Sequence, residues 1–401
     1  MNGVPAPRRA PPIWLLVIIT LSGTMAMHIF VPALPIATLG LHASVGEMQR
    51  TISLYILGLA VGQLFYGPLS DAVGRRPALL AGLALYTAAG IAAALAPDVH
   101  VLVAARLMQA LGGCAGLVLG RAIVRDTTQS DKAVRQLALM NLMMMMGPGL
   151  APVVGGLISS TFGWRPVFWV LAAAGAATLL LTWRMLPETG RPSRKFSAGI
   201  LLADYRSLIG SRRFVGFALG GGCTTTSFYA FIAAAPFIFA TQLHRPLHEV
   251  GFYLGMLMAG MAVGNALTSR LIRTVSIERL LLGGNAVSVV SAAGLAVTVW
   301  MGHIGVVSIM AWMFLYTCGA GMSSPAALTK AVSVDPLRVG SAAGIYGFMQ
   351  MAVGAICTAL AAVGHSNPAV SAVTVLLCAA VLGQVSFWTA LARPAAGRVS
   401  A

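Results

Sequence analysis

The chain contains twelve long apolar stretches separated by short polar connections. A helix needs about 20 apolar residues to cross a bilayer. Runs of that length lie at residues 13–34, 50–69, 77–96, 101–120, 137–159 and 166–186, and again at 214–240, 250–269, 279–300, 304–324, 341–363 and 370–392. Only 9% of the 401 residues are charged, whereas about 25% are charged in a soluble domain. The sequence therefore predicts an all-α integral membrane protein with twelve transmembrane helices.

The cations follow the order of the connections. In a soluble protein a formal charge of +16 would suggest a nucleic-acid partner. If the N-terminus is cytoplasmic, however, 22 of the 26 Lys and Arg residues fall on the cytoplasmic side, and only Arg50, Arg165 and Arg245 fall on the other. Positive charge collects on the cytoplasmic side of membrane proteins. We therefore expect both termini in the cytoplasm, with the lipid bilayer rather than nucleic acid accounting for the basic excess.

Most other classes of function lack their signatures in this chain. The five cysteines all lie in apolar stretches without a CxxC pair, so we expect no metal site and no disulfide framework. The sequence has no GxxxxGK[ST] segment for ATP and no G-x-S-x-G or H-E-x-x-H segment for hydrolysis. We therefore expect neither an enzyme nor an ATP-driven pump. A channel stays open as an alternative.

A polar connection at residues 187–213 divides the stretches into six and six. A shift of about 202 residues aligns LGLAVGQ at 57–63 with AGMAVGN at 259–265. Internal repeats of this size are typical of transporters that bind substrate between two halves. The sequence predicts two six-helix bundles, at residues 1–186 and 214–401, joined by a cytoplasmic linker at 187–213.

The segment GQLFYGPLSDAVGRRP, at residues 62–77, joins the second and third stretches. Gly67 and Pro68 would permit a tight exit from the helix, and Gly74 would permit a turn. Asp71 then has Arg75 and Arg76 nearby, so the segment could act as a charged latch that holds one conformation closed. The alternative is an ordinary basic turn.

These residues resemble the signature loop of the major facilitator superfamily. A second motif of that family, R-x-x-Q-x-x-G, is met by Arg106, Gln109 and Gly112, and is followed by GRAIVRD, which ends at Asp126 and adds a carboxylate to the expected latch. The segments VPALP, GPGLAPVVGG, WRPVFW and LPET are similar to those of the Bcr/CflA subfamily of bacterial multidrug efflux proteins. The resemblance implies that superfamily's fold and a place in the bacterial inner membrane.

The antiporter motif of the fifth stretch is matched at Gly147, Pro148, Pro152, Gly155 and Gly156. The two prolines each remove an amide donor, which predicts a bend. The two later glycines would let another helix approach closely. The resemblance implies that this helix favours exchange, whereas simple helix packing is the alternative.

Arg106 is the only charged residue deep inside a stretch, where an isolated cation costs at least about 2.5 kcal/mol. We expect it to face a polar cavity, and the resemblance implies a role in proton coupling. A permanent bond to helix carbonyls is the alternative.

The subfamily commonly has an acidic residue at the position of His28. All ten carboxylates of this chain lie in connections or at the ends of stretches. An imidazole titrates at about 6.5, so we hypothesise that His28 carries the coupling proton. A neutral, hydrogen-bonded histidine is the alternative, and Glu47 and Asp126 are fallback proton sites.

The expected function is proton-coupled efflux of small amphipathic drugs by alternating access, with Tyr55, Gln109, Met143 and Tyr229 as candidate cavity residues. The lack of deep acids favours neutral or weakly acidic compounds. Export of a sugar, an amino acid or a short peptide is the alternative. We expect no cofactor beyond the proton gradient, and a monomer.

Overall fold

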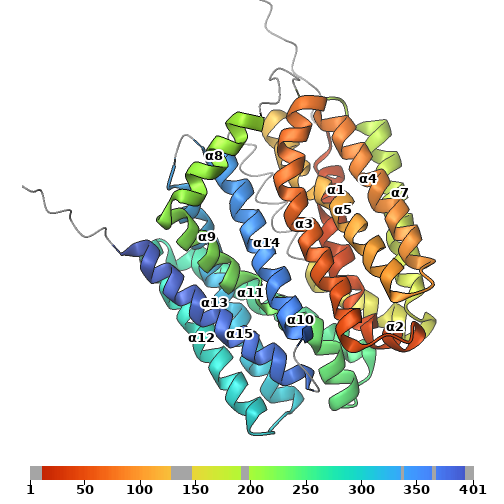
Figure 1. Ribbon diagram of the computed structural model, residues 1–401, viewed down its shortest axis with the longest axis vertical. Helices are drawn as coiled ribbons and strands as arrows, with labels where there is room; N and C mark the ends of the chain where they lie inside the picture. The colour runs from red at the N-terminus through yellow and green to blue at the C-terminus, as the bar shows by residue number, and fades with distance from the viewer. Residues whose placement is uncertain (1–10, 128–146, 191–197, 336–337, 364–366, 393–401) are drawn as a thin grey trace, which may run out of the picture. The chain divides into compact units, whose positions relative to one another are not determined.

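Helices make up all the regular structure of the residues that the computed structural model describes, which are 11–127, 147–190, 198–335, 338–363 and 367–392 (Figure 1). They are α1 (Ile13–Ile29), η1 (Val31–Ala33), α2 (Leu34–Gly40), α3 (Val45–Val73), α4 (Arg75–Ala94), α5 (Val99–Thr127), a helix at 147–162, α7 (Arg165–Met185), α8 (Ala198–Gly210), α9 (Arg212–Thr225), α10 (Phe228–Phe237), η2 (Ile238–Gln242), α11 (Leu247–Leu271), α12 (Ile277–Trp300), α13 (Val306–Val332), α14 (Val339–Val363) and α15 (Pro368–Leu391).

Eleven helical segments within these residues are long and apolar enough to cross a bilayer. Each coincides with one of the expected stretches. The remaining stretch, at 137–159, lies partly outside the described residues, and its described part belongs to the helix at 147–162. The all-helical fold class is thereby confirmed.

The outward faces of these helices are apolar, as a lipid environment requires. Large hydrophobic side chains are well exposed on helices of both halves of the chain, among them Phe65, Leu157, Trp183, Val290 and Trp388. In a water-soluble protein such a surface would drive aggregation, whereas in a bilayer it contacts lipid tails. The exposed residues therefore support the membrane assignment independently of helix length.

Local sequence signals mark several helix starts. Ser44 and Glu47 form a capping box at the start of α3, in which Ser44 Oγ accepts from the Glu47 amide and the Glu47 carboxylate accepts from the Ser44 amide. Asn367 Oδ1 accepts from the amides of Ala369 and Val370 at the start of α15. Glu47 thus has a structural role at a helix end.

The expected exit from α3 at Gly67 and Pro68 is wrong. The helix contains Pro68 and continues to Val73, and the chain turns only at Gly74, whose φ is 101°. A proline in a helix costs one hydrogen bond without ending the helix when neighbouring groups satisfy the freed backbone. The carbonyl that loses its amide donor at Pro68 is that of Leu64, four residues earlier.

By their contacts the residues form two compact units. The first unit comprises Met1–Ser197 and Ile232–Met258, and the second comprises Ala198–Phe231 and Ala259–Ala401. Residues 232–258 join the first unit although they follow the linker. Gln49 Nε2 of α3 donates to the Ala233 carbonyl at 3.3 Å. The expected domain boundaries stay a prediction.

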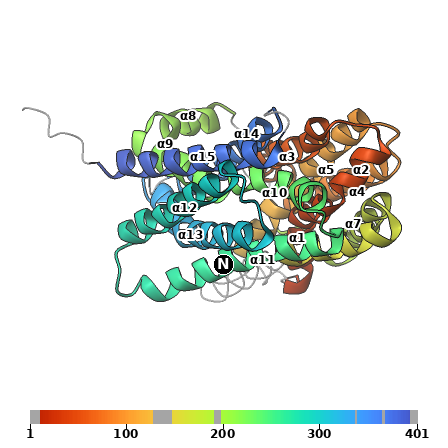
Figure 2. The same cartoon turned by 90° about the horizontal axis from the view of Figure 1, so that it is seen from below.

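In the first unit, α5 packs against α1, α3 and α4, and Figure 2 shows these helices grouped with α7. Glycines on α5 allow these contacts. A Cβ added at Gly112 would lie 2.4 Å from the Tyr86 amide nitrogen of α4, and one at Gly116 would lie 2.0 Å from the Ile19 carbonyl oxygen of α1. The backbone of α5 is therefore close to two neighbouring helices at once, and Arg106 projects from this central helix.

The second unit has α9 packed against α13, α14 and α15, with α8 beside α9 and α14. The expected linker thus contains a helix. Asn285 of α12 is completely buried and fully used: its amide nitrogen donates to Gln384 Oε1 at 2.7 Å and to the Ala380 carbonyl at 3.2 Å, and its oxygen accepts from Thr224 Oγ1 at 2.6 Å. The sequence did not predict this neutral network, because a single Asn or Gln in an apolar stretch belongs to no recognisable motif.

Candidate functional site

Arg106 lies on α5 inside the first unit and has no exposed surface. Its Nη1 donates to the Ala26 carbonyl of α1 at 2.9 Å and to Gln109 Oε1 at 2.8 Å. Gln109 stands three residues further along α5, which places both side chains on one face of the helix. The R-x-x-Q-x-x-G spacing therefore creates an arginine–glutamine pair, and Gly112 brings α4 close to it.

Three aromatic rings surround the guanidinium. Its Cζ lies 4.0 Å from the ring centroid of Tyr55, 5.5 Å from that of Phe30 and 5.7 Å from that of Phe168. The ring quadrupole attracts a cation, by about 2 kcal/mol or more when the pair is desolvated. The rings thus stabilise the charge without accepting the remaining N–H bonds. Phe168 belongs to the segment WRPVFW, but nothing in the sequence pairs it with Arg106.

Several N–H donors of Arg106 and Gln109 are left without an acceptor in the part of the chain that the structure describes. Nε and Nη2 of Arg106 and Nε2 of Gln109 are buried and have no acceptor among the described residues. Buried polar groups in proteins are normally paired, and an unpaired group on a charged side chain is the costliest kind. The arrangement can therefore accept a ligand atom or water at this edge of the guanidinium.

His28 lies on α1, in the same unit, and is 2% exposed. Its Nδ1 is 2.9 Å from the Thr24 carbonyl one turn earlier. A carbonyl only accepts, so Nδ1 carries the hydrogen and Nε2 is the atom that can gain or lose a proton. A protonated His28 would interact with the charge of Arg106. The two residues proposed for proton coupling are thus close enough to influence each other.

The expected cavity residues divide into three groups. Tyr55 and Gln109 both contact Arg106, and the Tyr55 hydroxyl donates to the Gly23 carbonyl at 2.6 Å. Tyr229 belongs to the second unit, where its ring packs against Phe228 at 4.5 Å. Met143 lies outside the described residues. Tyr55 and Gln109 therefore join the Arg106 cluster within the first unit.

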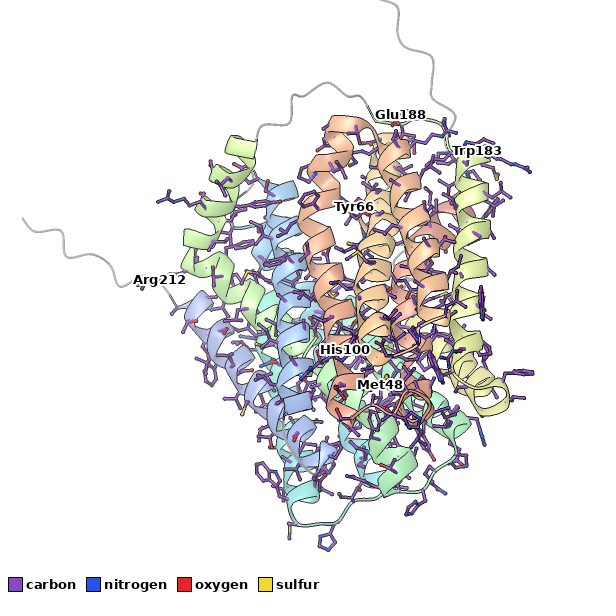
Figure 3. All side chains as sticks on the ribbon, turned by 45° about the vertical axis from the view of Figure 1, so that its right-hand side comes forward. Met48, Tyr66, His100, Trp183, Glu188 and Arg212 are labelled. Carbon is purple, nitrogen blue, oxygen red and sulfur yellow. The ribbon has the colours of Figure 1, made fainter. Side chains whose placement is uncertain are left out.

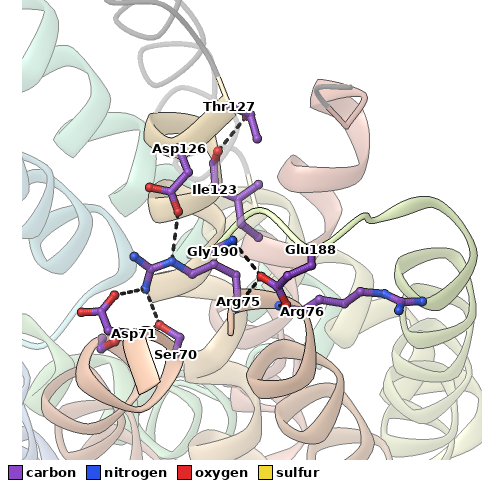
Figure 4. Close-up of polar contacts among 10 residues, drawn as sticks. Ser70, Asp71, Arg75, Arg76, Ile123, Asp126, Thr127, Glu188 and Gly190 are labelled. Carbon is purple, nitrogen blue, oxygen red and sulfur yellow. Dashed lines mark hydrogen bonds and ion pairs between the residues drawn. The ribbon is translucent and has the colours of Figure 1, made fainter. Parts of the chain in front are cut away.

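The expected latch is built around Arg75. Its guanidinium contacts Asp71 at 2.7 Å and Asp126, at the end of α5, at 3.0 Å, and Ser70 Oγ accepts from it as well. Figure 4 shows the arginine between the two acids. Gly67 takes part only through its carbonyl, which accepts from Ser70 Oγ at 2.8 Å, and a Cβ added at Gly67 would have nothing within 4 Å. Asp71, Arg75 and Asp126 are brought together as the charged-latch prediction requires.

Glu188 completes the cluster and was not among the predicted latch residues. Its carboxylate accepts from the amides of Arg75 and Arg76, the first residues of α4, at 2.9 and 3.2 Å, and from Gly190 at 2.7 Å. Carboxylates are favourable at helix N-termini. Arg76 turns away from the acids, and its Nη2 donates to the Trp183 carbonyl. The LPET segment, which holds Glu188, was the signal that could have found it.

The latch and Arg106 occupy different parts of the first unit. Figure 3 shows Glu188 and Trp183 at one end of its helices and Met48 and His100 toward the other end. Because Arg75 bonds to Glu188 through its backbone amide, the latch lies at the Glu188 end. Arg106 lies two turns into α5 from His100 and shares no contact with the latch residues. The unit therefore separates its charged cluster from its buried arginine.

The antiporter motif packs tightly on two neighbours within the first unit. A Cβ at Gly155 would lie 1.8 Å from the Ile29 carbonyl oxygen of α1, and one at Gly156 would lie 2.9 Å from the Leu247 carbonyl oxygen of α11. Gly251 of α11 returns the contact on the Pro152 carbonyl. The expected close approach is confirmed, whereas the bend at Pro148 and Pro152 stays a prediction. At the start of the motif, Gly147 faces the Leu21 side chain of α1.

Known proteins resemble the chain along nearly its whole length. A family model described as Major Facilitator Superfamily matches residues 16–358. "Multidrug resistance protein D" of Escherichia coli is 29% identical over 340 residues, which cover 84% of each chain. "Bicyclomycin resistance protein homolog" of Haemophilus influenzae is 25% identical over 324 residues, 80% of this chain and 81% of that one. The xylose transporter XylE from E. coli, in a partially occluded inward-open structure, shares the fold alone, with a TM-score of 0.70 and 14% identity over 94% of this chain and 97% of that chain.

Proposed function

Because the chain belongs to the Major Facilitator Superfamily, and is therefore a multi-pass membrane transporter, we propose that it exports small amphipathic compounds in exchange for protons. The drug-resistance names of the two relatives support this class of substrate. The observation that carries the proposal is the buried Arg106, whose Nη1 donates to the Ala26 carbonyl of α1, two residues before His28, in a unit where no described carboxylate pairs with it. A titratable imidazole beside a fixed cation is a proton site that responds to local charge.

The proposed cycle follows from electrostatics. Protonation of His28 at Nε2 would add a second positive charge close to Arg106 in a low-dielectric environment, where like charges repel strongly. Loss of that proton on the opposite side of the membrane would relieve the repulsion. Exchange further requires that the compound and the proton bind to alternate states of the transporter.

The test of proton coupling uses everted vesicles that contain the full chain and a pH-sensitive dye. His28→Gln is expected to abolish proton release on addition of substrate, while His28→Asp restores it by supplying another titratable group. His100→Gln makes the same substitution at an exposed histidine of α5 and is expected to have no effect. Full proton-coupled efflux by His28→Gln would contradict the role of His28.

Export of a sugar, an amino acid or a short peptide is the second candidate, and it requires the same fold. Expression in an efflux-deficient bacterium, with a panel of antibiotics and dyes, separates the two functions. We expect raised resistance that disappears when an uncoupler collapses the proton gradient. Unchanged susceptibility across the panel would favour the metabolite, and resistance that survives the uncoupler would exclude proton coupling.

A further inference from the structure

The unpaired edge of Arg106 points to a substrate class. We propose that the first unit contains a subsite for a single anionic group, a carboxylate or a sulfonate, formed by Nε and Nη2 of Arg106 with Nε2 of Gln109. The identity of the anion's carrier, an exported amphipathic compound, rests on the proposed function. The binding of the anion does not depend on transport, so it can be tested separately.

A count of the N–H groups of Arg106 shows which edge of its guanidinium is unpaired. A guanidinium has five N–H groups and no acceptor. Nη1 directs its bonds to the Ala26 carbonyl and to Gln109 Oε1, which leaves the single N–H of Nε and the two of Nη2 without an acceptor among the described residues. The amide nitrogen of Gln109 is in the same condition. Arg106 and Gln109, three residues apart on one helix, therefore present several unpaired N–H donors. Their only acceptor atom, Gln109 Oε1, already accepts from Arg106 Nη1.

The charge count gives the sign of the ligand. Both groups that accept from Arg106 are neutral, and no carboxylate of the described residues lies within ion-pair distance of it. The carboxylates near other cations in this unit serve the latch, at Asp71 and Asp126, or the Arg245 contact, at Glu249. A buried charge without a partner is strongly unfavourable. An anion brought by the ligand would supply the missing charge.

The positions of the unpaired donors and of the aromatic rings further restrict the chemical class of the ligand. Nε and Nη2 are neighbours on one side of the planar guanidinium, and parallel N–H bonds from such a pair match the two oxygens of a carboxylate. The rings of Phe30, Tyr55 and Phe168 lie 4.0 to 5.7 Å from the guanidinium carbon and provide apolar surface next to the charge. The ligand expected from both features is a monoanion attached to an aromatic or aliphatic body. A cationic drug would meet an uncompensated positive charge at this point.

The experiment compares two compounds of nearly the same shape. Purified full-length protein in detergent at pH 7.5 is titrated by calorimetry with 1-naphthaleneacetate and with the neutral 1-naphthaleneacetamide. We expect the acid to bind about tenfold tighter than the amide, as one charge-assisted pair would provide. Equal affinity for the two compounds would overturn the subsite and leave ordered water as the partner of these donors.

Substitutions test which residues cause the tighter binding of the acid. Arg106→Gln is expected to reduce the acid-to-amide ratio to about one, and Gln109→Leu to reduce it about threefold because one neutral donor is lost. Arg184→Gln also removes one positive charge, from an exposed side chain of α7, and should keep the ratio. Loss of the preference in Arg184→Gln alone would assign it to the surface charge. If Arg106→Gln does not fold, Arg106→Lys and Gln109→Leu still decide the question.

The outcomes for the subsite and for the proposed function are separable. A wild-type preference for the acid without any proton-coupled efflux would retain the subsite and reject the exporter. Efflux of neutral drugs by a protein that binds acid and amide equally would retain the exporter and reject the subsite. Both readouts use the complete chain.

Discussion

A guanidinium buried in a membrane-spanning helix can be stabilised by carbonyl dipoles, by aromatic faces or by a carboxylate. Arg106 uses the first two, through Ala26 and through the ring of Tyr55 at 4.0 Å. The sequence predicted a deep arginine facing polar groups, and it left open a permanent bond to a helix carbonyl. The structure contains such a bond but also leaves one edge of the same side chain without acceptors, so both interpretations describe part of the residue.

Gly74 is a residue at which backbone conformation and a polar contact coincide. Its φ of 101° is strained for any other residue, and an added Cβ would lie 2.6 Å from Glu188 Oε2. We predict that Gly74→Ala lowers the stability of the protein by about 1–2 kcal/mol from the backbone strain, with a further loss as the Glu188 carboxylate is displaced. The measurement is the apparent unfolding temperature in detergent.

Gly67→Ala is the matched control for that prediction. Gly67 lies in helix α3, and nothing lies within 4 Å of an added Cβ. Alanine is a better helix former than glycine by about 1 kcal/mol, so the unfolding temperature should stay unchanged or rise. If the unfolding temperature fell equally in both variants, neither the backbone strain at Gly74 nor the contact with Glu188 would account for the fall.

The helix at 147–162 makes close backbone contacts with two neighbouring helices. In a bilayer, helices associate through packing and hydrogen bonds, because lipid tails are as apolar as the side chains. Gly155 faces α1, whereas Gly156 faces the first turns of α11. The sequence predicted that these glycines permit a close neighbour, but it could not say that two different helices use adjacent positions of the motif.

Alanine substitution at two positions of this helix tests the packing. At Gly155 the new Cβ would lie 1.8 Å from the Ile29 carbonyl oxygen, while at Gly149 its nearest neighbour would be the Met258 Cβ at 3.6 Å, an ordinary contact. We predict that Gly155→Ala costs about 1–3 kcal/mol, the range for an overpacked contact, and that Gly149→Ala costs nothing measurable. Apparent unfolding temperatures, compared with substrate efflux, would show whether the packing also limits transport.

The chain combines long apolar stretches with a strongly asymmetric distribution of cations. Twelve stretches and 22 of 26 cations on one side follow from the sequence alone. The superfamily that its motifs predicted is confirmed by the family model, and the similarity to a bicyclomycin resistance protein homolog supports the resemblance to the Bcr/CflA group. The orientation of the termini stays a prediction of the charge distribution.

Reporter fusions test that orientation. We predict that a fluorescent protein fused to the C-terminus is fluorescent and that alkaline phosphatase at the same position is inactive, because the positive-inside rule holds that end in the cytoplasm. A phosphatase fused after Arg165, in a connection expected on the opposite side, is the positive control. Active phosphatase at the C-terminus would invert the whole topology.

The sequence by itself determined the helical class, the approximate positions of the described spans, the superfamily and the presence of a deeply buried arginine, Arg106, because apolar run length and local motifs are properties of neighbouring residues. It also located the acid and the arginine of the latch, Asp71 and Arg75. It missed Glu188, the ring of Phe168 and the Asn285 network, which depend on residues far apart in the chain. Only the tertiary structure decided which donors of Arg106 are satisfied, since each acceptor must come from a helix packed against α5, and no spacing in the sequence specifies that packing.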